Sequence, residues 1–310
     1  MRIRCGGARK PSAFASAAVT VVLVTVAAGD APTQAQLSQS VFTIQATNDS
    51  GSGSYVATFD DGIWDPEEQT FDWALPGQVD LYDEDTSEWV ASLLDATLFV
   101  RTEQLGEIEL NIGVISGGSL TTFVVGSPLM CFASTIPETF AQGRATASLT
   151  LTDALGDGAT LTGLGPVGSG AYRSYYNGYL SDGTRFTHLV GLISVGPGGT
   201  ATGSQSDPLA GFRPIGESVD DMSAEIAFTL TPVDLAFATT VFGVPEPEPC
   251  FGDINGDGVI DSADLGHLLA AYGTCEGDPD YDPDVDLNES GCVDLADLGV
   301  LLAIYGEVCW

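Results

Sequence analysis

Two stretches near the C-terminus carry oxygen-bearing side chains at matching intervals. Residues 253–273 (DINGDGVIDSADLGHLLAAYG) align with residues 286–306 (DLNESGCVDLADLGVLLAIYG) at an offset of 33 residues, and 13 of the 21 positions are identical. The identities fall on carboxylate, amide, glycine and apolar positions. Carboxylate and amide oxygens are ligands for hard cations, so this duplication indicates two similar cation sites.

The spacing within each stretch favours calcium. A calcium loop of twelve residues surrounds one ion with six to eight oxygens at roughly 2.3–2.6 Å, and a glycine at the sixth position permits its sharp turn. Gly258 and Gly291 occupy that position. The predicted ligands of the first loop are Asp253, Asn255, Asp257, Asp261 and Asp264, with the carbonyl of Val259; those of the second are Asp286, Asn288, Ser290, Asp294 and Asp297, with the carbonyl of Cys292.

Two differences from an ordinary EF-hand loop bear on affinity. Ser290 offers a hydroxyl where the first loop has a carboxylate, so we expect the second site to be weaker. An EF-hand loop ends in a Glu that binds calcium through both carboxylate oxygens, whereas both loops here end in Asp, so this bidentate contact is not assigned to either loop. The alternative interpretation is a pair of acidic turns that bind no ion.

Each loop leads into a short helix. Leu265, Leu268, Leu269 and Tyr272 follow helical spacing, and the same pattern returns at Leu298, Leu301, Leu302 and Tyr305. Gly273 and Gly306 stand where a C-terminal cap is expected. Proline-rich segments precede both loops, so no helix is expected before either of them.

A loop followed by an exiting helix, present twice, resembles the type I dockerin family over residues 250–310. The resemblance implies two antiparallel helices packed on their leucine faces and a fold that requires calcium. It also implies a cohesin-like protein or a cell-surface component as partner. Dockerins of cellulosomes usually carry a Ser/Thr pair at the end of the loop, whereas this chain has Ser262-Ala263 and Leu295-Ala296.

Four cysteines lie in this module: Cys250, Cys275, Cys292 and Cys309. In an exported chain, disulfides stabilise a domain whose core is small. We expect Cys250–Cys275 and Cys292–Cys309, because each bridge would tie a loop to the end of its own helix. A zinc site of four cysteines is the alternative. Cys131 stands alone in the main domain and is expected to be a buried small side chain.

The N-terminal residues 1–35 read as a secretory signal peptide. Arg2, Arg4, Arg9 and Lys10 precede the apolar stretch 13–28, which is shorter than the roughly 20 residues of a membrane-spanning helix. Cleavage is expected after Ala35, with Ala28 as the alternative site, and an uncleaved anchor is the competing interpretation. We therefore expect a secreted protein, extracellular or at the cell surface, without a membrane span after cleavage.

The charge of the chain excludes one class of partner. The sequence has 43 Asp and Glu but only 9 Lys and Arg, which gives a formal net charge of −34 at pH 7. Binding to a phosphate backbone needs the opposite sign, so we expect no nucleic-acid partner.

Residues 36–244 predict an antiparallel β-sandwich. Apolar residues alternate with polar ones at Ile108, Leu110, Ile112 and Val114, and strands are also expected at 41–44, 55–59 and 148–152. Two late runs, Ile226–Leu230 and Leu235–Val241, alternate in the same way, as expected for strands with one dry and one wet face. Residues 245–249 (PEPEP) predict a stiff linker. Loosely, this region resembles β-sandwich surface proteins exported by bacteria.

No catalytic motif accompanies these strands. His188 lies in an expected strand and is interpreted as structural. A carboxylate pair for glycoside hydrolysis is an open alternative. The densest acidic stretch holds Asp60, Asp61, Asp65, Glu67, Glu68 and Asp72, interleaved with Trp64, Phe71 and Trp73. Aromatic residues in two regions raise sugar binding as a further alternative: Trp64, Trp73, Tyr82 and Trp89, and Tyr172, Tyr175, Tyr176 and Tyr179.

The sequence thus predicts a mainly β protein, with an antiparallel sandwich followed by a small α-helical, calcium-binding, dockerin-like domain. We expect a secreted, non-enzymatic protein whose module serves protein–protein docking or surface display. The alternative is a protein that binds or degrades polysaccharide, in which case a glycan is the ligand.

Overall fold

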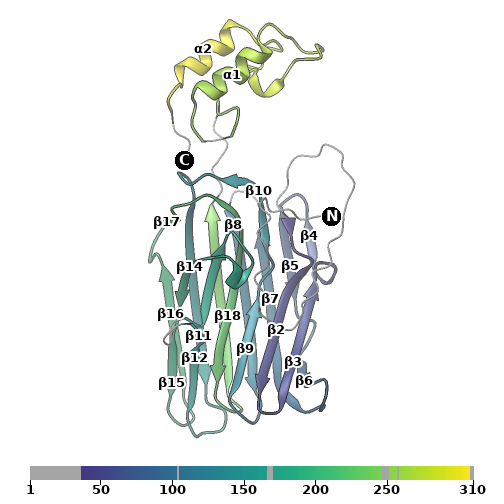
Figure 1. Ribbon diagram of the computed structural model, residues 1–310, viewed down its shortest axis with the longest axis vertical. Helices are drawn as coiled ribbons and strands as arrows, with labels where there is room; N and C mark the ends of the chain where they lie inside the picture. Colours follow the sequence, from purple (N-terminus) through teal and green to yellow (C-terminus); the bar gives the residue numbers. More distant parts are fainter. Residues whose placement is uncertain (1–35, 103–104, 166–169, 246–250, 257, 308–310) are drawn as a thin grey trace. The chain divides into compact units, whose positions relative to one another are not determined.

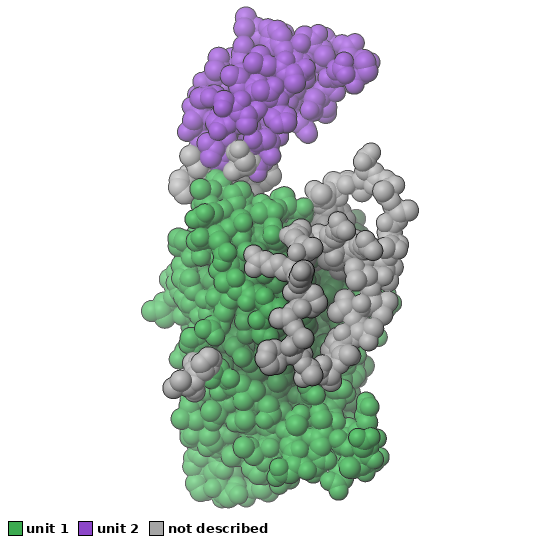
Figure 2. Space-filling view, in the orientation of Figure 1, with its two compact units in different colours: residues 1–245 green, residues 246–310 purple. Residues whose placement is uncertain are grey.

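The structure is a computed structural model that describes residues 36–102, 105–165, 170–245, 251–256 and 258–307. The predicted signal peptide and residues 246–249 of the predicted linker lie outside the described residues. The chain divides into two compact units, residues 1–245 and 246–310 (Figure 2). No helix in the described part of the chain is long and apolar enough to span a lipid bilayer.

The first unit is mainly β and consists of two antiparallel sheets in a sandwich (Figure 1). Ten strands form sheet A. Six of them follow one another in the order β1 (Gln36–Leu37), β10 (Met130–Ile136), β18 (Val219–Leu230), β9 (Thr121–Gly126), β2 (Ser40–Asn48) and β3 (Gly51–Thr58). The other four are β12 (Ala159–Gly163) and β13 (Tyr172–Tyr176), which pair with β18, and β15 (Leu192–Val195) and β14 (Thr184–Leu189), which pair with β12 and β13 respectively. This confirms the predicted fold class.

Nine strands form sheet B. Their order is β16 (Thr200–Asp207), β11 (Gln142–Thr152), β19 (Leu235–Pro245), β8 (Leu105–Ser116), β7 (Trp89–Arg101), β5 (Thr70–Ala74) and β4 (Ile63–Asp65), with β17 (Arg213–Pro214) paired to β11 and β6 (Val79–Tyr82) paired to β7. Two short 3-10 helices, η1 (Phe59–Asp61) and η2 (Leu180–Asp182), complete this unit.

The core of the sandwich lies between the sheets, where alternating side chains meet. On β8, Ile108, Leu110, Ile112 and Val114 are all at most 3% exposed, as the alternation predicts. Burial of one such side chain stabilises the fold by about 1.5–3 kcal/mol. Aromatic rings join the two sheets: Phe42 of β2 stacks on Trp73 of β5 with ring centroids 4.8 Å apart, and Phe186 of β14 meets Phe242 of β19 at 5.4 Å.

Strand β18 differs from the prediction because both of its faces are buried. Ile226 and Phe228 face the core, but Asp221, Ser223 and Glu225 on the other face are also at most 6% exposed. A loop around η2 covers them: the amide of Gly178 donates to Asp221 Oδ1 (2.6 Å) and that of Leu180 to Ser223 Oγ (2.9 Å). Polar residues on an outer face are thus buried by a segment distant in sequence.

Strand β19 has the predicted alternation with the opposite face inward. Ala236, Ala238 and Phe242 are buried, whereas Phe237 is 44% exposed. Phe237 lies over Gly113 of the neighbouring β8, where an added Cβ would come within 2.6 Å of the ring. The alternate apolar residues Leu235, Phe237 and Val241, which the sequence suggests as a core face, therefore lie on the outer surface of sheet B.

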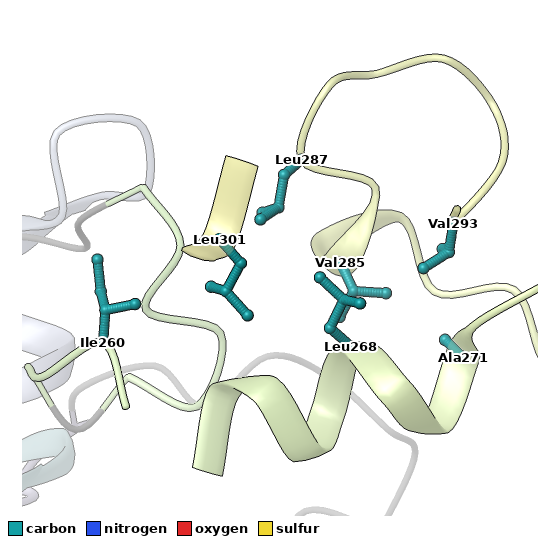
Figure 3. Packing of buried hydrophobic residues seen from close by; sticks show 7 residues of the cluster. All are labelled: Ile260, Leu268, Ala271, Val285, Leu287, Val293 and Leu301. Carbon is teal, nitrogen blue, oxygen red and sulfur yellow. The ribbon is translucent and has the colours of Figure 1, made fainter. Parts of the chain in front are cut away.

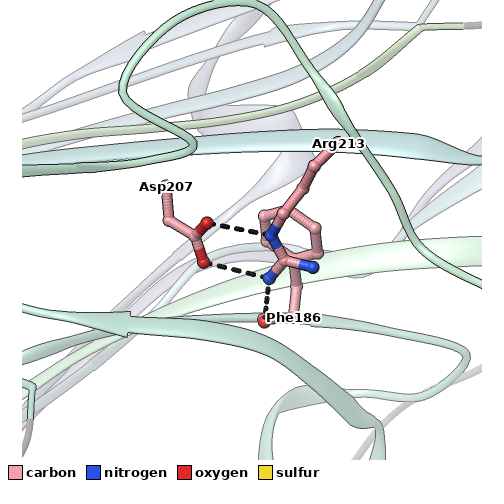
Figure 4. A network of polar contacts seen from close by, with 3 residues as sticks. All are labelled: Phe186, Asp207 and Arg213. Carbon is pink, nitrogen blue, oxygen red and sulfur yellow. Dashed lines mark hydrogen bonds and ion pairs between the residues drawn. The ribbon is translucent and has the colours of Figure 1, made fainter.

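A polar clamp fastens the edge of sheet B to sheet A. Arg213 of β17 donates to both carboxylate oxygens of Asp207 on β16 (2.8 and 2.9 Å) and to the carbonyl of Phe186 on β14 (2.8 Å), as Figure 4 shows. The guanidinium also lies 3.9 Å from the centroid of the Phe186 ring. The planar fork of arginine permits all these contacts at once.

The second unit contains two short α-helices, α1 (Ser262–Ala271) and α2 (Leu295–Ala303), and the 3-10 helix η3 (Pro283–Val285). Its core is small and consists of Ile260, Leu268, Ala271, Val285, Leu287, Val293 and Leu301 (Figure 3). Ile260 and Val293, like Leu268 and Leu301, occupy equivalent positions of the two repeats. Both repeats therefore contribute to one shared core.

The predicted leucine faces pack only in part. Leu265 and Leu298 pack against the core beside the buried Leu268 and Leu301. In contrast, Leu269 and Leu302 are 53% and 54% exposed, and Tyr272 and Tyr305 are each 45% exposed. Helix α1 ends at Ala271 and α2 at Ala303, so neither tyrosine continues the helical face.

Candidate metal centre

Each C-terminal loop is closed by its last predicted ligand. Asp264 accepts hydrogen bonds at Oδ1 from the amides of Ile254 (2.8 Å) and Asn255 (3.1 Å) near the start of the loop. Asp297 does the same in the second loop, accepting from the amide of Asn288 at 3.1 Å. Both side chains are 0% exposed. These carboxylates therefore hold the two ends of each loop together.

The first predicted ligand of each loop is held by the sharp turn. Asp253 Oδ2 accepts from the amide of Gly258 (2.8 Å), and Asp286 Oδ2 accepts from that of Gly291 (2.7 Å). The φ angles of these glycines are 82° and 87°, in the left-handed region that side chains disfavour. The turn glycines that the spacing predicts are thus confirmed in both loops.

Asp286 is the best defined of the predicted ligands. It is 5% exposed and also accepts hydrogen bonds from the amide of Ser290 (3.1 Å) and the phenol of Tyr281 (2.8 Å). Its carboxyl group lies within hydrogen-bonding reach of Asp297. Burial raises the pKa of the Asp286 carboxyl, but the hydrogen bonds with Tyr281, Gly291, Ser290 and Asp297 outweigh this effect and keep the pKa below its usual range.

Asp261 and Asp294, predicted as the ninth-position ligands, cap the helices. Asp261 Oδ1 accepts from the amide of Ala263 and Asp294 Oδ1 from that of Ala296, both at 2.7 Å. The carboxylates of Asp264 and Asp297 accept from the amides of these two caps, which completes a capping box at each helix. At least one oxygen of each cap is thereby committed to its helix.

The uncharged oxygen ligands predicted for the second loop lie close to one another. Asn288 Oδ1 accepts from the amide of Ser290 (2.9 Å), and the Ser290 hydroxyl donates to the carbonyl of Cys292 (3.2 Å). In the first loop, Asn255 is exposed and Val259 is half-buried, and Asp257 lies outside the described residues. All predicted ligands of the second loop, by contrast, lie within the described residues.

Carboxylates alone do not form a site in the described residues. Within residues 36–307, outside the gaps, no group of three or more His, Cys, Asp or Glu side chains is positioned to hold a metal ion. The second loop supplies two close carboxylates, Asp286 and Asp297, and its remaining predicted oxygens belong to an amide, a hydroxyl and a carbonyl. That mixture suits calcium, which accepts both charged and neutral oxygens.

The two loops are joined reciprocally through their eighth residues. The amide of Gly306, after α2, donates to the carbonyl of Ile260 in the first loop (2.8 Å). The amide of Gly273, after α1, donates to the carbonyl of Val293 in the second loop, also at 2.8 Å. The end of each helix is thus hydrogen-bonded to the loop of the other repeat, so neither loop is structurally independent.

The predicted disulfide pairing is wrong. Cys275 is bonded to Cys292, and the same residues form an antiparallel β-bridge with Cα atoms 3.9 Å apart. The segment after α1 lies beside the end of the second loop, so the bridge joins the repeats rather than closing each one. Cys250 and Cys309 lie outside the described residues. The Cys275–Cys292 bond also removes the thiolates that a four-cysteine zinc site needs.

Cys131 also differs from the expectation of a lone cysteine. It is 5% exposed, as predicted, but it is disulfide-bonded, and its partner lies outside the described residues.

Two carboxylates of the acidic stretch in the sandwich stabilise turns. Asp61 Oδ2 accepts from the amide and hydroxyl of Thr58 (2.7 and 2.8 Å), and Asp65 Oδ1 accepts from the amides of Glu67 and Glu68 (2.8 and 3.2 Å). Backbone and side-chain hydrogen bonds from Thr58 lower the pKa of Asp61. These carboxylates therefore have structural partners.

Half of the eight aromatic residues considered for sugar binding are buried. Trp73, Tyr172, Tyr175 and Tyr176 are all at most 5% exposed. Tyr82 is 50% exposed, and Trp64, Trp89 and Tyr179 are half-buried. His188 is exposed on β14, where it pairs with Arg173 of β13. Neither predicted aromatic group therefore forms a flat exposed platform.

No known protein family and no curated protein matches this chain. Among solved structures, similarity extends to the CBM22-1–GH10 modules of Clostridium thermocellum xylanase 10B complexed with xylohexaose, with 10% identity over 70% of this chain and 30% of that chain and a TM-score of 0.20. Infectious bursal disease virus of the Gx strain gives 9% identity, 68% and 62% coverage and a TM-score of 0.24. This chain spans less than two thirds of each of these chains, and the TM-scores are too low to assign a shared fold or function.

Proposed function

We propose that this chain is an exported, non-enzymatic β-sandwich protein whose C-terminal unit is a dockerin-like module that binds two calcium ions. In this proposal the module serves protein–protein docking or surface display. The calcium ions stabilise its small core and position the loops and helices.

The observation that carries the proposal is the proximity of Asp286 and Asp297. Both side chains are at most 5% exposed, and their carboxyl groups lie within hydrogen-bonding reach of each other. Two buried carboxylates at this separation destabilise each other unless a proton or a cation lies between them. Hydrogen bonds from Tyr281, Gly291 and Ser290 favour the charged form of Asp286, which is the form that can bind a cation.

The ligand sets follow the duplicated positions. The first ion is assigned to Asp253, Asn255, Asp257, the Val259 carbonyl, Asp261 and Asp264, and the second to Asp286, Asn288, Ser290, the Cys292 carbonyl, Asp294 and Asp297. Because Asp261 and Asp294 cap helices, we assign their contacts to bridging water, as is common at the ninth position of such loops.

A docking role is supported by the exposed residues of the two helices. Leu269 lies in α1 and Tyr272 directly follows it; Leu302 and Tyr305 occupy the equivalent positions at α2. All four residues are 45–54% exposed. Apolar side chains that recur in both repeats but are not needed for the core are available to a partner. We propose that the partner is a cohesin-like protein or another component of the cell surface.

Capture of a partner from the producing cell tests this function. The mature chain, immobilised through its sandwich, is exposed to proteins of the secreted and cell-surface fractions with calcium or with a chelator. The proposal predicts a partner that is retained in calcium, released by chelator and lost with the Leu269→Ser/Leu302→Ser variant. The matched control is Leu120→Ser, at a leucine of the sandwich that is 56% exposed. A partner that is retained equally well with chelator and by the Leu269→Ser/Leu302→Ser variant would contradict the proposed docking function.

A further inference from the structure

The outer face of sheet B carries an open groove that the proposed docking function does not use. The groove has a volume of about 440 Å³ and is lined by residues of four adjacent strands. We call it the outer groove and define it by six of its lining residues: Ile63 of β4, Asp72 of β5, Thr97 and Phe99 of β7, and Glu109 and Asn111 of β8. Ile63 is 74% exposed and Phe99 is half-buried, so the groove presents apolar surface to solvent.

Hydrogen-bonding groups flank the Phe99 ring on both neighbouring strands. Phe99 is paired with Asp72 on β5 and with Glu109 on β8, so one carboxylate lies on each side of it. Asn111 donates through Nδ2 to Thr97 Oγ1 and Glu109 Oε1, both at 3.0 Å. Its Oδ1 atom is buried and has no hydrogen-bond partner among the described residues. The groove thus combines an aromatic ring with two carboxylate acceptors, one of which is held by Asn111.

A row of polar side chains extends from the groove across the sheet. Thr97 is paired with Asn111, and the row continues through Thr239 of β19, Ser148 of β11 and Ser204 of β16. The Ser148 and Ser204 hydroxyls are 2.8 Å apart. Adjacent strands lie about 4.8 Å apart, so five strands give a line of hydroxyl and amide groups about 19 Å long. This line is uncharged along its length.

The charges of the groove select the class of ligand. Asp72 and Glu109 repel an anion, and the nearby cation Arg101 is already paired with Glu107 (3.7 Å) and lies 5.5 Å from the Phe99 ring. A cationic peptide could use the two carboxylates but not the uncharged row beyond them. A neutral chain that is rich in hydroxyls and has apolar faces uses the ring, the carboxylates and the row together.

We propose that the outer groove binds a neutral polysaccharide, with Phe99 stacking on one sugar ring and Asp72 and Glu109 accepting hydrogen bonds from its hydroxyls. Thr239, Ser148 and Ser204 continue the contact along the chain. The groove lies wholly within the sandwich, so this inference stands or fails independently of calcium binding and docking.

Affinity electrophoresis of the full mature chain tests the proposal. The native gels contain xylan, a mixed-linkage β-glucan, mannan or starch, and each is run with chelator present so that the calcium module does not contribute. We expect at least one of these neutral polymers to retard the protein. Phe99→Ala is expected to weaken that retardation about tenfold, and Asp72→Asn, a conservative change at an exposed site, to weaken it severalfold.

The matched controls are Tyr82→Ala, which removes an exposed aromatic ring of the same sheet outside the groove, and Glu84→Gln, which removes an exposed carboxylate. Both are expected to leave retardation unchanged. The proposal is overturned if none of the four polymers retards the protein, or if Phe99→Ala and Asp72→Asn both behave as the controls do. Displacement of the bound polymer by oligolysine at low salt, with no competition from a soluble oligosaccharide of that polymer, also overturns it.

Discussion

Tyr281 and Asp286 are joined by a hydrogen bond of 2.8 Å in which the phenol donates to Asp286 Oδ2. This bond to Asp286 is the main cause that raises the pKa of Tyr281, to about 12. It orients a predicted calcium ligand from outside the loop. Removal of such an outer partner typically lowers metal affinity ten- to a hundredfold. We therefore predict that Tyr281→Phe weakens calcium binding in the second loop about tenfold, as measured by titration of the full chain.

Tyr272→Phe is the matched control for this change, because Tyr272 is 45% exposed and lies outside both loops. It should leave both affinities as they are. Equal calcium affinities in Tyr281→Phe and wild type would show that the phenol does not support the site.

The reciprocal bonds of Ile260 with Gly306 and of Val293 with Gly273 predict that the calcium sites are coupled. An ion that orders the first loop also fixes Ile260, whose carbonyl accepts a hydrogen bond from Gly306 after α2. We predict that Asp264→Asn abolishes the first site and also weakens the second by about fivefold, which corresponds to about 1 kcal/mol of coupling. Calcium titration of the variant measures the remaining site.

Asp280→Asn, at an exposed carboxylate outside both ligand sets, is the control for the loss of one negative charge. A second site of wild-type affinity in Asp264→Asn would contradict coupling through these bonds.

The Cys275–Cys292 disulfide is predicted to stabilise the module. It closes a segment with a sequence separation of 17, and a loop of this size contributes about 3 kcal/mol by restricting the unfolded chain. The double variant Cys275→Ser/Cys292→Ser should therefore lower the free energy of unfolding of residues 246–310 by about that amount in calorimetry of the protein at saturating calcium. The sandwich transition should not move. A digest of native protein that links Cys275 to Cys250 would refute the pairing itself.

The sandwich is predicted to lose stability in acid partly through Asp83. Its carboxylate accepts hydrogen bonds from the amides of Ser52, Thr86 and Asp85 and from the Thr86 hydroxyl, and these lower its pKa to about 2. A pKa that is lower in the folded state gives stability above the unfolded value, which is lost as pH falls from about 4 to about 2. Asp83→Asn should therefore be less stable than wild type at neutral pH, with a difference that shrinks over this window.

Urea denaturation at a series of pH values measures this difference, with Glu84→Gln as the neighbouring control. A constant difference from pH 7 to pH 2 would mean that Asp83 contributes through packing alone.

Sequence patterns predict those parts of the fold that depend on local periodicity. The alternation at Ile108–Val114 predicts β8 and its core face, and the turn glycines Gly258 and Gly291 are in the predicted conformation. The burial of Asp221 and Glu225 is not predictable in this way, because it depends on the distant loop around η2. Phe237 is apolar but lies outward, because the absence of a side chain at Gly113 of the neighbouring strand leaves a place for its ring.

The same limit applies to the candidate sites. Spacing predicts the loops of the metal centre, but the role of Tyr281 requires the position of η3, and the disulfide requires the β-bridge between Cys275 and Cys292. The outer groove combines residues from four strands between positions 63 and 111, and no sequence interval marks them as neighbours. An isolated Phe or Asn in an alternating strand gives no signal of its own until the register is known.

Isothermal titration of the full chain with calcium tests the central claim most directly. We predict two ions per chain, with the first loop tighter than the second because Asp257 is replaced by Ser290 in the repeat, and no detectable binding in the double variant Asp264→Ala/Asp297→Ala. Absence of binding heat in the wild-type protein at several temperatures, or equal heats in wild type and double variant, would contradict the proposal that these loops bind calcium.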